Sequence, residues 1–300
     1  MSASFANALA AAHEAAGSQN HPASTLYVVA TPIGNLADIS LRALHVLARV
    51  DVVACEDTRH TQQLLRAYGL DRPGSQLLAV HQHNEAEAAH NVLERLGQGQ
   101  RVAYVSDAGT PAISDPGARL VAAVRQAGFR VMPLPGASSV TTALSASGMT
   151  GDHGFVFAGF LPSKATERQM AVQHLAQESR AVVLLEAPHR IEALAQALAV
   201  LGKRPITLGR ELTKQFEQIE TLHAQDLSAW LAEKPERLRG EFVLVLHDAP
   251  VDDATGEGLR VLQLLLPELP LKTAVKLAAE ISGESKNTLY EQALALKNQG

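Results

Sequence analysis

Cysteine and aromatic residues are scarce in this chain of 300 residues. Its one cysteine, Cys55, excludes an intrachain disulfide framework and a four-cysteine zinc site, and it fits a reducing cytoplasm. Aromatic residues make up 4% of the chain, so Leu, Val and Ala must fill the core that a hydrophobic content of 46% predicts. No apolar run approaches the roughly 20 residues that a membrane-spanning helix needs. We therefore expect a well-packed soluble protein of roughly two domains.

Basic residues are not in excess, and the familiar phosphate-binding motifs are absent. The formal net charge of −5 argues against indiscriminate nucleic-acid binding, but it leaves room for an RNA recognised by a local basic patch. The sequence contains no GxGxxG motif, no P-loop motif and no GxSxG nucleophile elbow. These absences favour a ligand with few phosphate groups.

The N-terminal residues lack the character of a signal peptide. The stretch 1–24 is rich in Ala, has no basic start, and carries His13 and Glu14 where a signal peptide is apolar. We expect residues 1–25 to form a flexible tail.

Strand and helix patterns alternate through the first half of the chain. Short apolar strands are expected at 26–30, 52–55, 77–80, 102–105 and 130–134. Helical spacing of apolar residues fills the intervals at 41–48, 61–68, 85–96 and 118–127. This alternation predicts an α/β domain with a parallel, doubly wound sheet. Its loops 31–35, 106–117 and 135–139 follow strand ends, so they are expected to converge on one crevice.

The loop that ends at Gly117 is the most distinctive of these. It follows an apolar strand and reads SDAGTPAISDPG, with two Gly, two Pro and two Ser-Asp pairs. Such a loop binds a ligand mainly with its backbone. One alternative is a capped turn in which Asp115 is the N-cap and Pro116 the first helical residue. Two Ser-Asp pairs exceed what capping requires, which favours a ligand.

Histidines cluster around residue 85 without forming a recognisable metal site. His81, His83 and His90 have a spacing that fits no tight chelate, and no cysteine lies near them. We expect no metal.

The second half of the chain predicts a different kind of sheet. Strands are expected at 155–159, 181–186, 206–212, 218–222 and 242–246, with helices only at 163–177 and 190–201. Fewer helices between strands favour a mixed sheet with antiparallel pairs. The charged residues of this half lie in its loops, and Arg210-Glu211 follows a buried strand, where a charge is costly.

Composition also suggests where the domains end. A Gly-, Asp- and His-rich stretch near 148–154 predicts a junction between domains at 26–148 and 149–248, and an acidic stretch at 249–258 predicts a linker. The helical patterns at 271–281 and 286–296 flank a short turn with Gly283, as in a helix-turn-helix unit spanning 259–300. Its charges nearly cancel, so protein contact, capping and RNA binding remain alternatives.

Seven motifs in collinear order resemble one family. They are LYVVATPIGNLADISLRAL from Leu26, EDTR at 56–59, SDAGTPAISDPG at 106–117, PLPGASSV at 133–140, FAGFLP at 157–162, EAPHR at 186–190 and GRELTK at 209–214. The chain thus resembles the tetrapyrrole methylase (class III) superfamily of S-adenosylmethionine-dependent methyltransferases. Within it, the chain is similar to the branch that methylates the 2′-hydroxyl of a cytidine in small-subunit ribosomal RNA.

The resemblance implies two α/β domains, commonly assembled as homodimers, with S-adenosylmethionine in the cleft between them. It assigns the cofactor contacts to Ser106, Asp107, Ala108, Gly109, Ala137, Ser138 and Leu185, with the backbone near Phe160 and Leu161 on the adenine side. It places Pro32, Gly34 and Asn35 at the rim that faces the substrate.

The resemblance further implies a ribosomal RNA or 30S particle as partner. The phosphate-binding residues would be Arg59, Lys164, Arg190, Arg210 and Lys214. The attacking hydroxyl gains from a proton acceptor, for which the motifs offer Asp57, Glu186 and Glu211 without ranking them. Two alternatives remain open: a methylase of the same superfamily acting on a tetrapyrrole or a protein side chain, and a non-catalytic protein that binds ribosomes.

Overall fold

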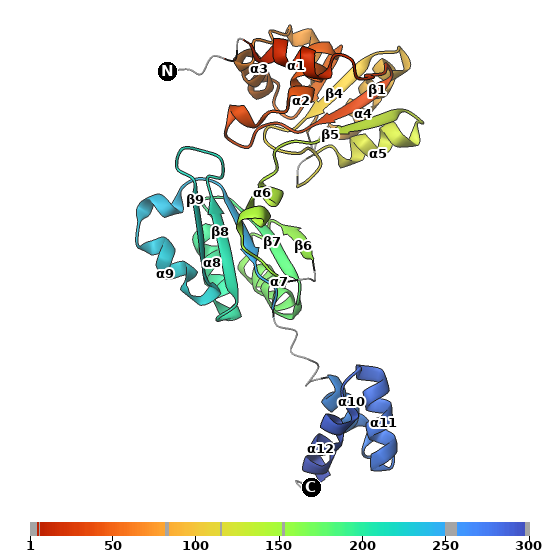
Figure 1. Ribbon diagram of the computed structural model, residues 1–300, viewed down its shortest axis with the longest axis vertical. Helices are drawn as coiled ribbons and strands as arrows, with labels where there is room; N and C mark the ends of the chain where they lie inside the picture. Colours follow the sequence, from red (N-terminus) through yellow and green to blue (C-terminus); the bar gives the residue numbers. More distant parts are fainter. Residues whose placement is uncertain are drawn as a thin grey trace.

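The computed structural model describes residues 5, 7–81, 84–114, 116–151, 154–249 and 257–297. The expectations for His83, for Asp115 and for most of the linker therefore lie outside the described residues. Two α/β units and a smaller helical unit follow one another along the chain (Figure 1). No helix in the described ranges is long and apolar enough to cross a membrane.

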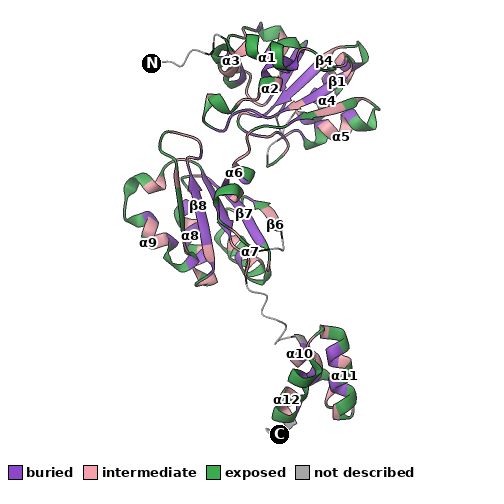
Figure 2. Cartoon of the chain, viewed as in Figure 1, coloured by how far each residue is buried: buried purple, intermediate pink, exposed green. Residues whose placement is uncertain are grey.

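The first unit is built on a fully parallel sheet with the strand order β3-β2-β4-β1-β5. Its strands are β1 (Thr25–Val29), β2 (Val52–Cys55), β3 (Leu77–Ala79), β4 (Arg101–Val105) and β5 (Arg130–Leu134). The central strands are buried on both faces, as the purple strands of Figure 2 show. Burial on both faces explains why they read as apolar runs rather than as alternating patterns. The predicted parallel, doubly wound sheet is confirmed.

Helices cover both faces of this sheet and start at identifiable caps. They are α1 (Ala8–Ala16), α2 (Leu41–Arg49), α3 (Thr58–Ala67), α4 (Glu85–Gly97) and α5 (Ala118–Gln126). The Ser40 hydroxyl accepts a hydrogen bond from Ala43 N at the start of α2, and Asp57 caps α3 in the same way. Helix α5 begins at Ala118, as the helical spacing at 118–127 predicted, and not at Pro116 as in the capped-turn alternative. Glu85 of α4 accepts hydrogen bonds from Gly117 N and Arg119 N at this start.

Helix α1 corrects the expectation of a flexible N-terminal tail. Its Ala12 and Ala16 are buried, and Ala12 packs with Leu44 of α2 and with Tyr68. The alanines that suggested a tail are small side chains that let α1 approach α2 closely. Sequence composition alone could not distinguish the two, because the packing partner lies some 30 residues further along the chain.

The second unit contains the expected mixed sheet, in the order β6-β7-β10-β8-β9. Its strands are β6 (Phe155–Gly159), β7 (Ala181–Glu186), β8 (Pro205–Arg210), β9 (Gln218–His223) and β10 (Phe242–Leu246). Only the β6–β7 pair is parallel, and the other three pairs are antiparallel. Strand β8 ends at Arg210, two residues before its predicted end, because the chain turns at Glu211 with φ of 51°.

Helices pack on both faces of the second sheet. Helices α7 (Ala165–Gln177), α8 (Ile191–Leu198) and α9 (Leu227–Ala232) cover one face, and α9 was not predicted. Helix α6 (Ser139–Ala146), which follows β5 of the first unit, packs Val140 and Ala143 against the other face. Helix α6 therefore lies between the two units, as Figure 1 shows.

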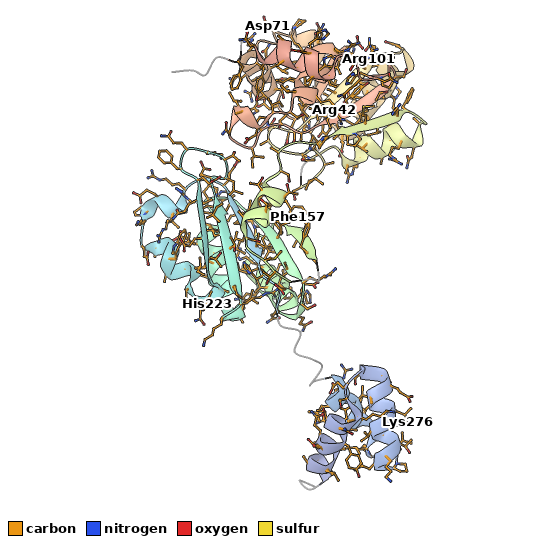
Figure 3. All side chains as sticks on the ribbon, in the orientation of Figure 1. Arg42, Asp71, Arg101, Phe157, His223 and Lys276 are labelled. Carbon is orange, nitrogen blue, oxygen red and sulfur yellow. The ribbon has the colours of Figure 1, made fainter. Side chains whose placement is uncertain are left out.

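The C-terminal unit has a hydrophobic core of its own. Its helices are α10 (Glu257–Leu265), α11 (Leu271–Ser282) and α12 (Lys286–Lys297), and α10 was not predicted. Leu262, Ala278 and Leu289, one from each helix, are fully buried together. Figure 3 shows the side chains of all three units, with Arg42 and Arg101 on the first, Phe157 and His223 on the second, and Lys276 on the third.

Candidate functional site

The site begins where the parallel strands of the first sheet end. The loops after β1, β4 and β5 leave the same edge of the sheet, and hydrogen bonds tie them together. Thr31 and Gly109 exchange two backbone hydrogen bonds of 2.9 and 3.0 Å, and the Thr110 hydroxyl donates to Ala137 O at 3.1 Å. The expected convergence of these loops is thus present in the structure.

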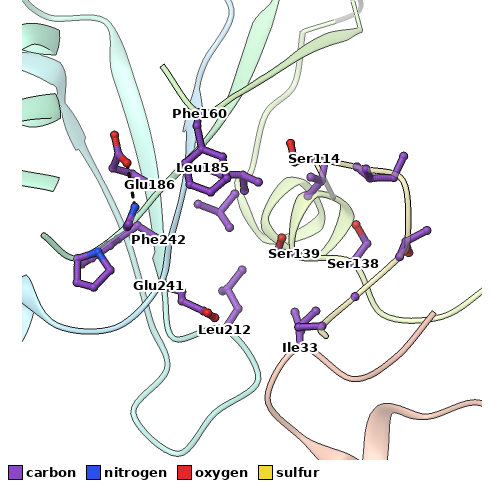
Figure 4. A pocket seen from close by; sticks show the side chains of 18 residues that line it. Ile33, Ser114, Ser138, Ser139, Phe160, Leu185, Glu186, Leu212, Glu241 and Phe242 are labelled. Carbon is purple, nitrogen blue, oxygen red and sulfur yellow. Dashed lines mark hydrogen bonds between the residues drawn. The ribbon is translucent and has the colours of Figure 1, made fainter. Parts of the chain in front are cut away.

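A cavity of about 320 Å³ opens between these loops and the second sheet (Figure 4). Its lining comes from both α/β units and is largely apolar. The lining residues are Ile33, Ala108, Gly109, Thr110, Ile113, Ser114, Ser138, Ser139, Val140, Phe160, Leu185, Glu186, Ala187, Pro188, Leu212, Glu241, Phe242 and Val243. A volume of this order lies at the lower end of the range of small-molecule sites, roughly 300–1,000 Å³.

Four of the seven residues expected to contact the cofactor line this cavity: Ala108, Gly109, Ser138 and Leu185. The other three are near it and hold the loops. The buried Ser106 hydroxyl is 3.3 Å from the carbonyl oxygens of both Ala108 and Gly109, and Asp107 Oδ1 accepts a hydrogen bond from Asp57 N. Ala137 offers its carbonyl to Thr110.

A second cavity of about 480 Å³ adjoins the first. The two share Ile33, Ala108 and Glu241. The second is lined by Pro32, Ile33, Gly34, Leu36, His60, Gln63, Leu64, Ala67, Asp107, Ala108, Lys214 and Glu241. Two of the three rim residues expected from sequence, Pro32 and Gly34, are among these. The third, Asn35, instead caps the 3₁₀ turn that follows, where its side chain accepts from Ala37 N.

Asp57 is poorly suited to accept a proton. Its carboxylate accepts hydrogen bonds from Arg59 N and from the Arg59 guanidinium, which lower its pKa to about 2. It lines neither cavity. Capping α3 accounts for its place in the EDTR motif.

Glu186 is buried at the wall of the first cavity. One carboxylate oxygen accepts from Ala187 N at 2.9 Å and pairs with Arg190 Nε at 3.1 Å. The other oxygen, Oε2, is buried without a hydrogen-bond partner among the described residues. An unpaired buried oxygen costs free energy unless a ligand supplies a donor. Arg190 also donates to Leu161 O, so its guanidinium is held by protein groups on both sides.

Glu211, Lys214 and Glu241 form a charged cluster at the edge of both cavities. Lys214 Nζ lies 2.8 Å from Glu211 Oε1 and 2.9 Å from Glu241 Oε2. Burial alone raises the pKa of Glu211, but the hydrogen bonds from Lys214 and from Glu241 N outweigh it and lower the pKa overall. Burial lowers the pKa of Lys214, and its two carboxylate partners raise it by more. Lys214 is therefore a paired ammonium and not a free phosphate ligand.

Arg210 also differs from its expected role. Its guanidinium donates to three carbonyls, those of Arg239, Phe216 and Glu236, at 2.7–3.1 Å. These bonds fasten the β8–β9 loop and explain why a charge is tolerated after a buried strand. Arg59 and Lys164 are the two expected phosphate ligands that remain exposed, each in a surface ion pair of little strength.

Sequence reasoning missed several residues of the lining. Ile33, Ser114 and Leu212 stand inside three of the seven motifs but were not assigned to the site, and Glu241 to Val243 lie at the start of a strand outside those motifs. Backbone conformation marks the site more clearly than residue type does. Four of the five non-glycine residues with positive φ in the described ranges lie in the two loops beside the cavities: Ala112, Ser114, Glu211 and Thr213. Such strain concentrates at functional sites.

The fold and the paired cavities define a two-domain α/β protein with a small-molecule site between its sheets. The model of the Tetrapyrrole (Corrin/Porphyrin) Methylases matches residues 25–228, and the chain belongs to this family. The model of the RsmI C-terminal HTH domain matches residues 252–297.

Named relatives agree with this placement. The chain is 48% identical to "Ribosomal RNA small subunit methyltransferase I" of Haemophilus influenzae over 90% of this chain and 96% of that protein. It is 49% identical to the protein of the same name from Pseudomonas aeruginosa, over 91% and 97% of the two chains. The crystal structure of a diphthine synthase has the same fold, with a TM-score of 0.55 and 15% identity over 74% of this chain and 90% of that one.

These findings confirm the resemblance drawn from the motifs and the expected fold class. The chain is a methyltransferase, as the sequence predicted.

Proposed function

We propose that this chain transfers a methyl group from S-adenosylmethionine to the 2′-hydroxyl of a cytidine in small-subunit ribosomal RNA. The observation that carries the proposal is the identity of 46–49% with relatives named "Ribosomal RNA small subunit methyltransferase I" over about nine tenths of the chain. The paired cavities support it, because methyl transfer needs a donor space and an acceptor space in contact.

The first cavity fits the cofactor. Its apolar walls suit an adenine ring, and the unpaired Oε2 of Glu186 suits a donor such as an amino or hydroxyl group. When bound, S-adenosylmethionine supplies an electrophilic methyl group on a positively charged sulfur. Ala108, Gly109, Ser138 and Leu185 would surround it, while Ser106, Asp107 and Ala137 maintain the loops that form the cavity.

The second cavity would take the acceptor nucleotide. Pro32 and Gly34 line it as expected. Lys214 is the one lysine or arginine among its lining residues. Arg59 and Lys164, both exposed, would contact phosphates of the surrounding RNA. A few local cations of this kind are compatible with a net charge of −5.

The wider setting follows from the same proposal. We expect a cytoplasmic homodimer acting on ribosomal RNA or an assembled 30S particle, with domains at 26–148 and 149–248 and a linker at 249–258. The C-terminal helices would aid recognition of the particle, as their match to an HTH domain suggests.

Labelled cofactor tests the proposal directly. Purified protein, S-adenosylmethionine with a tritiated methyl group and 30S particles lacking the modification should yield labelled 2′-O-methylcytidine in digested RNA, identified by mass spectrometry. Label on a base, on ribosomal protein or on an added tetrapyrrole would contradict the proposed substrate. Cofactor binding without any transfer would indicate the non-catalytic alternative.

A further inference from the structure

Glu241 is a carboxylate residue that lines both cavities. Three residues line both spaces, and of these only Glu241 carries an ionisable side chain. Figure 4 shows its side chain leaving the start of β10 toward Ile33 of the first unit, beside Leu212. A donor in one cavity and an acceptor in the other would meet where these three residues lie.

The main chain around Glu241 is fixed by a reciprocal pair of contacts. Glu241 N donates to Glu211 Oε1 at 3.0 Å, and Glu211 N donates to Glu241 O at 3.0 Å. Gly240 makes this approach possible, because its φ is 91° and a Cβ there would lie 2.4 Å from Glu211 Cγ. The start of β10 therefore has little freedom to move.

Lys214 pairs with the carboxylate of Glu241, whose side chain is 75% exposed, and links it to the first unit. Its ammonium lies 2.9 Å from Glu241 Oε2, and its stem packs so closely on the β1 loop that a Cβ on Gly34 would be 2.3 Å from Lys214 Cγ. The carboxylate thus keeps one oxygen paired with a cation from its own unit. Through the stem of Lys214, this carboxylate is connected to the loop after β1, which lines the second cavity.

The other carboxylates near the site are less well placed. Asp57 lines neither cavity, and Glu186 lines only the first. Asp107 lines only the second, and its Oδ1 accepts from Asp57 N. Glu211 lines neither and is bound to Lys214 and to the main chain of Glu241.

We propose that Glu241 is the catalytic proton acceptor and that Lys214 is its positioning residue. This inference rests on the proposed function. The bond from O2′ to the methyl carbon forms while the bond from sulfur to that carbon breaks, and sulfur keeps the electron pair. The hydroxyl proton passes to Glu241, which becomes neutral and later returns the proton to water. A carboxylate suits this role because the hydroxyl becomes strongly acidic only as the new bond forms.

Glu241→Gln tests the acceptor role, with Glu220→Gln as the matched control. Glu220 is an exposed carboxylate on β9, outside both cavities. We expect E241Q to lower kcat about 100-fold or more, with KM for 30S particles and the affinity for S-adenosylmethionine within about threefold of the parent. E220Q should match the parent in all three.

The acid side of the pH profile separates catalysis from structure. The kcat of the parent should fall toward low pH, and the residual kcat of E241Q should not show this fall. An active parent with an equally active E241Q would overturn the inference while leaving the proposed function intact. A parent that methylates no RNA would instead refute the proposed function.

Lys214 and the cofactor provide the remaining tests. Lys214→Met should lower kcat at least tenfold, and Lys214→Arg should restore part of the loss, because an arginine keeps the charge that holds the carboxylate. Should E241Q weaken binding of S-adenosylmethionine but not of S-adenosylhomocysteine, with kcat unchanged, Glu241 would serve the sulfonium charge and the proton-acceptor role would be wrong.

Discussion

At Gly117 the backbone passes over the ring of Tyr104 at the end of the loop 106–117. Its φ is 117°, and a Cβ built there would lie 2.1 Å from Tyr104 Cε1. The Tyr104 hydroxyl in turn donates to Pro116 O at 2.6 Å, which fastens the loop to the strand below it. A side chain at this position would have to displace a fully buried aromatic ring.

Gly117→Ala should therefore destabilise the protein by roughly 3 kcal/mol, from the strained φ together with overpacking of the core. Gly128→Ala is the control, since Gly128 has φ of 80° but no neighbour within 4 Å of its Cβ. It should cost about 1 kcal/mol, from the positive φ alone. Urea unfolding followed by circular dichroism measures both, and equal losses would contradict the role assigned to Tyr104.

At the scale of elements, α1 is held to the first unit through a group of histidines. His21 and His45 are buried, with ring centroids 4.9 Å apart, and His13 of α1 stacks on His45 at 5.6 Å. Burial lowers the pKa of both His21 and His45. Nearby arginines lower both further, Arg49 facing both rings and Arg42 and Arg101 facing His21. The folded state keeps these two rings neutral.

Acidification should loosen this attachment. The unfolded chain binds protons at these histidines near pH 6.5, whereas the folded chain does so only at lower pH. Their contribution to stability is fully present above about pH 6.5 and is lost as pH falls through the folded pKa values. Thermal unfolding at pH 7.5 and 5.5 measures the effect, and a His21→Gln, His45→Gln double variant should show a smaller drop. An identical drop in both proteins would assign it to other groups.

At the scale of the whole molecule, the C-terminal unit is separable from the catalytic units. It has its own core of residues from α10, α11 and α12, and its family model is distinct from that of the two sheets. Every residue that lines the first or the second cavity precedes residue 244 in the chain. Cofactor binding and particle recognition are therefore expected to depend on different parts of the chain.

Removal of residues 250–300 should leave the affinity for S-adenosylmethionine unchanged and lower the activity on 30S particles at least tenfold. Calorimetry measures the first quantity and transfer of labelled methyl groups the second. Activity on a short RNA fragment serves as the control, because it should fall less than activity on the particle. Full activity of the shortened protein on particles would make the helices dispensable for recognition.

The sequence by itself determined the strands, most helices and the family. Apolar runs mark the buried strands, and small residues with Gly and Pro mark the loops, because these depend on local backbone preferences and on burial. Collinear motifs then identified the family, and Ala108, Gly109, Ser138 and Leu185 line the first cavity.

Only the tertiary structure decided which polar groups are paired. Arg210 binds carbonyls up to 29 residues away, and Lys214 binds Glu241 27 residues away. These partners come into contact only when β8 pairs with β10 and their loops pack together. No local sequence pattern predicts these contacts. The same closure places Glu241 between the cavities, and the packing of the first unit separately buries α1 against α2. Residue type predicts that a charge needs a partner, but the fold selects which one.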